Sequence, residues 1–212
     1  MMSRIKFLLI CGVVAALAAC SNDDERYPDL ITDFVVALGD DDGNVVAILT
    51  DDGVRLAVDN TVTGIPRNAR VRSFCSYAPT ADSRVAIYNI IGIPLLSQLK
   101  DDVAVQHHPT GVAAVWQSGG YVNMHLLPKT YGGHQKWAFA VDSMTQNAAG
   151  STTHHLSLYH DQGSDAEAYS DNMYLCIHPD SLATPLLPTD SLRLAITTYD
   201  GVQTWQFPAP TR

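Results

Sequence analysis

Short apolar runs separated by turn signals fill the chain from Leu30 onward. No stretch keeps a 3.6-residue apolar period over three helical turns, which argues against long amphipathic helices. The runs are instead of strand length and rich in Val, Ile, Leu and Tyr, and Asp-Gly or Gly-Gly pairs at several junctions supply the positive φ angles that tight hairpins need. The pattern therefore predicts an all-β protein.

The first group of runs predicts five strands in about sixty residues, the number that an OB-like small barrel uses. These strands are expected at residues 34–38, 45–49, 54–58, 69–77 and 85–91. We therefore assign residues 29–98 to an N-terminal OB-like five-stranded barrel and residues 99–110 to a linker.

The composition changes after the linker, because all eight His and all three Trp lie beyond residue 106. Such a shift supports a second domain. Its turn signals separate seven expected strands, at residues 111–117, 121–127, 136–141, 154–160, 173–177, 192–199 and 202–207. This number and spacing predict a C-terminal antiparallel β-sandwich over residues 111–212.

The N-terminus carries an export signal. Arg4 and Lys6 precede an apolar run that ends in Leu-Ala-Ala-Cys, so residues 1–19 are predicted to be a signal peptide and Cys20 to be lipidated, with palmitate among its acyl chains. Several acyl chains anchor a protein stably in a membrane. The acidic tether that follows, residues 20–28, resembles the signal of surface-exposed lipoproteins of Bacteroidota, so we expect an outer-membrane protein that faces outward. A plain secreted protein is the alternative.

Charge excludes one class of partner. The chain has 13 Lys and Arg against 22 Asp and Glu, a net charge of −9. An acidic surface repels phosphate backbones, so no nucleic-acid partner is expected. With 46% hydrophobic and 17% charged residues, the chain has the composition of an ordinary globular protein.

No motif predicts catalysis, a cofactor or a metal. The eight His residues occur without a His-Glu-x-x-His or Cys-x-x-Cys spacing. After the tether the one Glu is Glu167, which excludes a Glu pair for glycoside hydrolysis, and no Gly-x-Ser-x-Gly motif is present. Cys75 and Cys176 lie in apolar runs that favour buried free thiols, although an oxidising compartment permits a bridge between them. We therefore expect a protein that is not an enzyme, while an Asp pair stays open.

Six side chains are candidate ligand contacts: Trp116, Tyr121, Trp137, Trp205, Arg70 and Arg72. The Trp rings are most simply packing residues, and the alternative is that one of them stacks on carbohydrate. The two Arg residues share a strand face, where they would form an anion-binding patch or pair with neighbouring Asp residues.

Ordered motifs along the whole chain resemble those of the NigD-like lipoproteins of Bacteroidota. They are the lipidation signal with its acidic tether, the Asp51-Asp52-Gly53 turn, the strand at residues 85–90, the hairpin at residues 115–123 and the closing segment at residues 190–201. The resemblance implies an OB-like barrel followed by a β-sandwich, and a role in immunity to a bacteriocin.

Three functions are therefore expected in order of preference. The first is a non-catalytic, surface-anchored lipoprotein that acts by binding a protein or glycan, with bacteriocin immunity as the role that the resemblance implies. The second is an accessory glycan- or peptide-binding lipoprotein of a surface uptake system. The third is a hydrolase with an unrecognised site, which a pocket lined by close Asp residues or by a His, Asp and Ser set would support.

Overall fold

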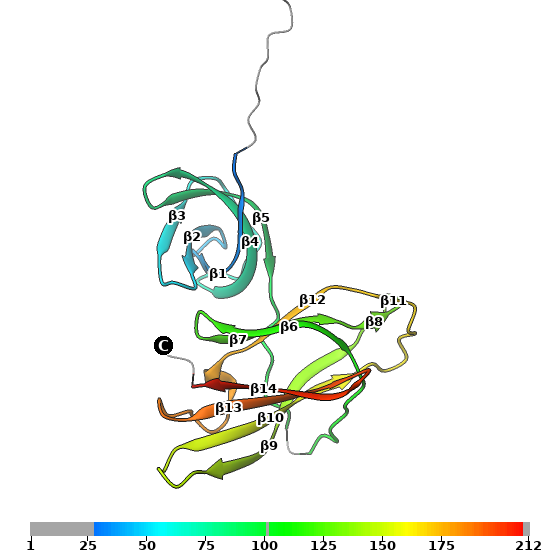
Figure 1. The fold of residues 1–212 in the computed structure, drawn as a ribbon. Helices are drawn as coiled ribbons and strands as arrows, with labels where there is room; N and C mark the ends of the chain where they lie inside the picture. The colour runs from blue at the N-terminus through cyan, green and yellow to red at the C-terminus, as the bar shows by residue number, and fades with distance from the viewer. Residues whose placement is uncertain (1–27, 101, 210–212) are drawn as a thin grey trace, which may run out of the picture.

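The structure is a computed structural model that describes residues 28–100 and 102–209, and it is built almost entirely of β-strands (Figure 1). The first five strands close into a barrel in the order β1-β2-β3-β5-β4. They are β1 (Ile31–Gly39), β2 (Val45–Thr50), β3 (Arg55–Val58), β4 (Arg70–Ala81) and β5 (Arg84–Gly92). The predicted all-β class and five-stranded barrel are confirmed.

Apolar side chains from the strands form the barrel core. Val35 and Ala37 on β1 are fully buried, as are Ile48 on β2 and Cys75 on β4. The barrel closes where β3 and β5 pair in parallel, with Val58 opposite Val85. Because strands joined by hairpins cannot run parallel to each other, this closure needs the long connection through β4.

The remaining strands form the predicted β-sandwich. A four-stranded sheet has the order β14-β13-β10-β9, a three-stranded sheet β12-β7-β6 and a small two-stranded sheet β11-β8. Their strands are β6 (Gly111–Ser118), β7 (Tyr121–Leu127), β8 (Lys129–Thr130), β9 (Lys136–Gln146), β10 (Thr152–Asp161), β11 (Tyr169–Ser170), β12 (Met173–Ile177), β13 (Ser191–Thr198) and β14 (Gly201–Pro208), with the 3₁₀ turn η1 (Pro179–Ser181) after β12.

Two features of the sandwich differ from the expectation. β8 and β11 have two residues each, too few for an alternating pattern to appear in the sequence. The pair β10 and β13 is parallel, with Leu156 opposite Leu194, so the sandwich is not wholly antiparallel. The apolar residues that the two large sheets present to each other, such as Phe139, Met124 and Leu175, form its core.

The expected domain boundary at residue 98 is wrong, because residues 93–98 pack on the sandwich. Leu96 is 3% exposed within the sandwich core, and its N–H donates to the carbonyl of Cys176 on β12 at 2.8 Å. The barrel therefore ends with β5 at Gly92.

The expected linker, residues 99–110, is also part of the sandwich. The N–H of Leu99 donates to the carbonyl of Phe139 on β9 at 2.7 Å, and the N–H of His108 donates to that of His160 on β10 at 3.1 Å. This crossing segment, residues 93–100 and 102–110, satisfies backbone groups at the edges of both sheets, which water would otherwise have to solvate. Because its apolar residues follow neither a helix nor a strand period, the sequence pattern predicted a linker here.

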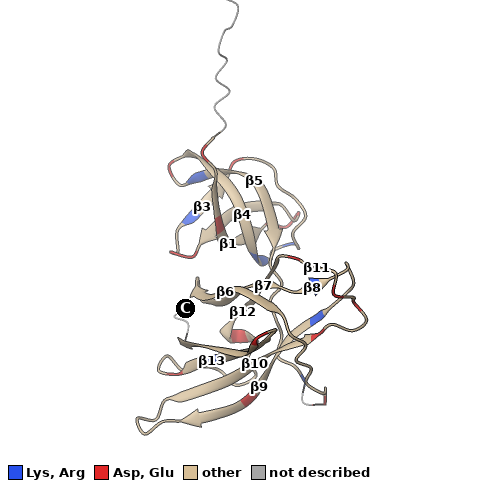
Figure 2. Ribbon diagram, turned by 45° about the vertical axis from the view of Figure 1, so that its right-hand side comes forward, with Lys and Arg blue, Asp and Glu red and all other residues tan. Residues whose placement is uncertain are grey.

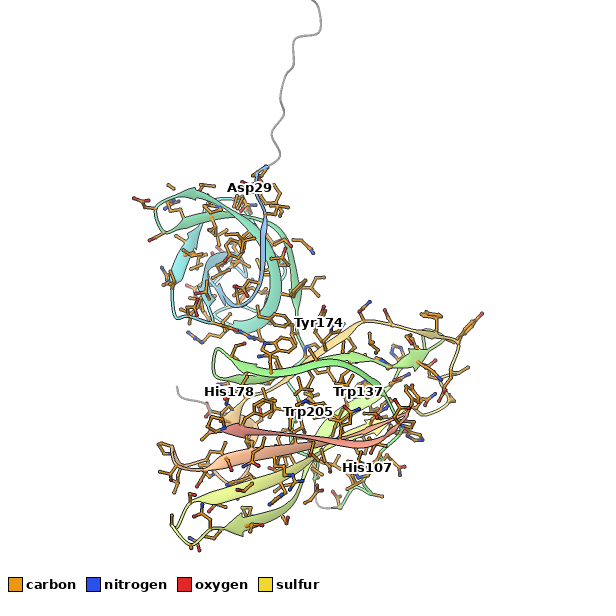
Figure 3. All side chains as sticks on the ribbon, viewed as in Figure 1. Asp29, His107, Trp137, Tyr174, His178 and Trp205 are labelled. Carbon is orange, nitrogen blue, oxygen red and sulfur yellow. The ribbon has the colours of Figure 1, made fainter. Side chains whose placement is uncertain are left out.

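The described chain begins at the end of the barrel that lies away from the sandwich, where Figure 3 labels Asp29. Along β1 it then reaches the sandwich side, where Phe34 meets Trp116. The predicted signal peptide, Cys20 and most of the tether lie outside the described residues. Within the described residues, no helix has the length and apolar character needed to cross a membrane.

Candidate binding site at the domain junction

A buried arginine joins the two domains. Arg72 on β4 is 4% exposed and forms an ion pair with Asp51, which follows β2. Its Nη2 lies 2.8 Å from Asp51 Oδ2 and 3.1 Å from Asn123 Oδ1 on β7 of the sandwich. The guanidinium also lies over the ring of Tyr121, 4.5 Å from its centroid. Removing one partner of a buried pair typically costs about 3–5 kcal/mol, so this contact fixes how the domains meet.

The hairpin between β6 and β7 is shaped for this contact. Its turn residues, Gly119 and Gly120, have φ angles of +57° and +84°, which glycine adopts without strain. A Cβ at Gly119 would collide with the carboxylate of Asp51. The turn therefore needs glycine both for its conformation and for the close approach of the barrel.

Beside Arg72, aromatic rings from both domains pack together. Phe34 on β1 and Phe74 on β4 come from the barrel, and Trp116 on β6 and Tyr174 on β12 from the sandwich. Phe34 contacts Trp116 edge to face at 5.0 Å between ring centroids, and Phe74 stacks on Tyr174 at 5.3 Å. Aromatic pairs at this spacing add about 0.5–1.5 kcal/mol each beyond the area they bury. Trp116 is thus a junction residue, not a ring presented to a ligand.

An apolar cleft of about 700 Å³ opens next to these rings. Barrel, sandwich and crossing segment all contribute residues to its lining; Tyr174 and Trp137 are labelled in Figure 3. The lining residues are Phe74, Ile91, Gly92, Ile93, Pro94, Leu95, Leu96, Gln135, Trp137, Asn172, Met173, Tyr174 and Leu175. Ile91 and Leu95 are 56% and 51% exposed. A mainly apolar cleft with a few polar groups is the usual form of a ligand site.

Hydrogen bonds hold the side chain of Gln135, a polar residue of the cleft lining, in place. Gln135 donates from Nε2 to Asp165 Oδ2 at 2.8 Å and lies 2.8 Å through Oε1 from Nε2 of His160. His160 in turn stacks on Trp137, with 3.8 Å between ring centroids. Asp165 also accepts hydrogen bonds from Thr130 and from the N–H groups of Tyr131 and Gly133, and these bonds lower its pKa well below the usual value. One ring face of Trp137 is therefore occupied by His160.

A second, polar cleft of about 820 Å³ lies on the Asp51 side of the junction. Its charged or titratable lining residues are Asp51, Asp52, Arg70, Tyr121, His178 and Asp180. Asp51 pairs with Arg72, and Nδ1 of His178 accepts a hydrogen bond from the N–H of Asp180 at 3.2 Å. Burial raises the pKa of Tyr121. Both signs of charge line this cleft, and the hydroxyl of Thr50, also in its wall, is bound into the turn after β2.

The six sequence candidates therefore lie in different places. Arg70 and Tyr121 line the polar cleft and Trp137 the apolar one. Arg72 is buried against Asp51, so pairing with an Asp, one of the two alternatives, is what the structure shows. Trp205 on β14 lies between the two sheets and packs against the sandwich core (Figure 3).

Sequence reasoning missed the residues that complete the junction. Phe34, Phe74 and Tyr174 lie in ordinary strand patterns, and Asn123 is a fully buried polar residue in an apolar strand. The interruption of an apolar run by Asn123 is a signal that a sequence reader could have used, because a buried amide needs partners. Nothing in the pattern of the three aromatic residues identifies their partners in the other domain.

Two cysteines and two histidines lie in the cores of the domains. Cys75 and Cys176 are buried and free, as preferred from the sequence, and burial raises the pKa of their thiols to about 12 and about 11. His154 and His160 are buried together with Leu156 and Leu158 on β10. Among the described residues, no three His, Cys, Asp or Glu side chains are placed to hold a metal ion.

Comparison with known proteins identifies the family. A model of the NigD-like C-terminal beta sandwich domain matches residues 93–209, more than half of the chain. The chain belongs to the NigD-like family. We find no match among curated proteins.

Several solved structures share the fold of this NigD-like protein. A NigD-like immunity protein from Bacteroides caccae is 23% identical, with a TM-score of 0.64 over 85% of this chain and 93% of that one. A protein from Parabacteroides distasonis described as toxin-related is 17% identical, with a TM-score of 0.68 over 84% and 92%. A protein from Bacteroides fragilis described as a lipoprotein is 12% identical, with a TM-score of 0.62 over 87% and 99%. At these identities the likeness shows the shared two-domain fold.

Proposed function

We propose that this NigD-like protein is a non-catalytic lipoprotein that acts by binding. It is anchored through Cys20 in the outer membrane, faces the outside of the cell, and binds its partner in the apolar cleft. The observation that carries this proposal is the cleft itself, about 700 Å³ in volume and lined from both domains. Because Arg72 and the aromatic rings hold the domains together, the cleft is formed before a partner arrives, which lowers the entropic cost of binding.

The preferred partner is an apolar segment of another protein, and the preferred role is immunity to a bacteriocin. Most of the cleft wall is aliphatic or aromatic, and Asn172 adds a polar side chain that a peptide backbone can contact. The amide of Gln135 is already bonded to Lys129, Asp165 and His160. Large apolar side chains seated in such clefts dominate the binding energy of many protein complexes. The neighbour described as an immunity protein supports the choice of a protein partner.

Glycan capture in a surface uptake system is the second candidate function, and it depends on one residue. Trp116 packs on Phe34 and Trp205 on the sandwich core. Trp137 also packs against that core, but it lines the apolar cleft. His160 covers one of its faces. A sugar therefore has at most one ring face available for stacking.

A survival assay tests the first function. A deletion strain is complemented with the wild-type gene, with Ile91→Asp in the cleft, or with Val46→Asp on the barrel exterior, and challenged with bacteriocin preparations from neighbouring strains. Ile91 and Val46 are both exposed strand residues, at 56% and 41%. We expect Ile91→Asp to reduce protection about tenfold or more. Binding of an apolar partner would bury the new carboxylate without a counter-charge, which opposes binding. Val46→Asp should protect like the wild type.

Other outcomes separate the candidate functions and test the anchor. Unchanged sensitivity of the deletion strain contradicts the immunity role. A glycan that raises the melting temperature of the wild type but not of Trp137→Leu supports the second candidate. Cys20→Ser should lose palmitate labelling and leave the membrane fraction, and retention of both contradicts the proposed anchor.

A further inference from the structure

The two sides of the β-sandwich differ in how the edges of their sheets are covered. On one side, the crossing segment covers the edges of both sheets: Leu96 bonds to β12 and Leu99 to β9. On the other side, β14 ends the four-stranded sheet and β6 ends the three-stranded sheet. Within the described residues, no backbone strand pairs with the outer edge of either.

Of these two edges, β6 has a form of protection. A bulge between Val112 and Ala114 interrupts its pairing with β7, and bulges twist an edge away from further pairing. Its Gln117 side chain donates to the carbonyl of Pro208 at 2.9 Å. β6 carries no charged residue and is drawn without blue or red in Figure 2.

Apart from its last residue, Pro208, whose carbonyl accepts from Gln117, β14 lacks the usual protection of an edge strand. All eight of its residues pair with β13 in one unbroken register, and its sequence, Gly-Val-Gln-Thr-Trp-Gln-Phe-Pro, contains no charge. Natural proteins normally guard such an edge with Lys, a bulge, a short strand or a covering segment. Val202 is 64% exposed, and Trp205 and Phe207, which point into the core, are only partly buried.

We propose that β14 pairs antiparallel with β14 of a second copy of this chain, which joins the two four-stranded sheets into one continuous sheet. The same strand on both sides gives a closed two-fold contact. A charged strand would oppose this pairing, because like charges directly opposite each other on adjacent strands repel. The neutrality of β14, in a chain of net charge −9, permits it.

The arrangement of the layers fits two anchored copies. The two-fold axis that relates antiparallel strands within one sheet is perpendicular to that sheet. The three-stranded sheet and the barrel lie in turn on the same face of the four-stranded sheet (Figure 1), and Asp29 lies at the far end of the barrel (Figure 3). Rotation about this axis leaves both barrels, and Asp29 of each copy, on one side. Two such copies can therefore be attached to one membrane.

Cross-linking in cells tests the contact. Thr204 lies near the centre of β14, so Thr204→Cys is placed close to its symmetry mate. We expect the full-length variant to form a disulfide-linked dimer on a non-reducing gel. Met144→Cys is the matched control, because Met144 is 52% exposed on β9, at the opposite edge of the same sheet. It should remain a monomer under the same oxidant.

A charge exchange tests the same contact without a new thiol. Thr204→Lys, purified with its anchor in detergent, should self-associate about tenfold more weakly than the wild type by sedimentation equilibrium. A mixture of Thr204→Lys and Thr204→Asp should associate again, and circular dichroism should show both variants folded.

Three results would overturn the proposal: a Thr204→Cys chain that remains a monomer, self-association that Thr204→Lys leaves unchanged, and a Thr204→Cys cross-link to a different protein only. The last would identify β14 as the docking edge for another chain. None of these results depends on the apolar cleft, so this proposal and the binding function can fail separately.

Discussion

The two sides of the sandwich show two ways to complete a β-sheet. On the side of β9 and β12, the crossing segment forms hydrogen bonds with the edge strands and buries Leu96 in the core. On the side of β14, the outer edge of a regular and neutral strand has no backbone partner among the described residues. An edge that the chain covers itself contributes to the stability of one copy, whereas an open edge offers its hydrogen bonds to another chain.

The largest difference between the two sides should appear on truncation of Leu96. Leu96→Ala removes a side chain that is 3% exposed in the sandwich core, so we expect the free energy of unfolding to fall by about 2–4 kcal/mol. Leu95→Ala, at a neighbour that is 51% exposed, should change it by no more than about 0.5 kcal/mol. Urea denaturation followed by circular dichroism measures both. Equal effects would mean that the crossing segment does not close this side.

A smaller effect on stability is expected at Asp190, next to the end of β14, and it should depend on pH. Asp190 accepts hydrogen bonds from the N–H groups of Thr152 and Leu187, which lower its pKa, and its own carbonyl binds the N–H of Ala209 just after β14. Because the folded-state pKa lies below the unfolded value near 3.8, this contribution to stability is complete above that value. It is lost as the pH falls through the folded-state pKa.

Asp190→Asn should therefore lower stability at pH 7 and flatten its dependence on pH below about 4. Thermal melts from pH 7 to pH 2 measure this, and amide exchange at Ala209 reports whether the end of β14 opens. Asp200→Asn, at an exposed residue of the turn between β13 and β14, is the control. An acid limb of the same slope in wild type and Asp190→Asn would contradict the assignment.

The smallest effect is predicted for β14 itself. Thr204→Lys changes an exposed side chain at an edge, so the unfolding free energy of the dilute, monomeric protein should stay within about 0.5 kcal/mol of the wild type. A large loss would show that β14 supports the fold of one copy as strongly as the crossing segment does. The comparison between a closed and an open side would then be wrong.

Local pattern was sufficient for the strands themselves. Residues 121–127 and 173–177 were predicted with the bounds that β7 and β12 have, because alternation and Gly or Asp turns are encoded next to each other in the chain. The parallel pair β10 and β13 and the course of the crossing segment were not predicted, since their partners are distant in sequence. Trp137 was identified as a candidate contact by its type, but its place in a cleft depends on Tyr174 and Ile91 from two other strands.

The sequence by itself determined the all-β class, the order of barrel and sandwich, the predicted export signal ending at Cys20 and the neutral composition of β14, all of which are properties of contiguous residues. Only the tertiary structure decided that Arg72 is buried between domains, that the crossing segment belongs to the sandwich and that β14 lies at an open edge. The physical reason is that the burial of a charge and the pairing of an edge depend on which distant segments meet. Alternation along a strand determines which of its faces is apolar, but not which neighbour covers that face.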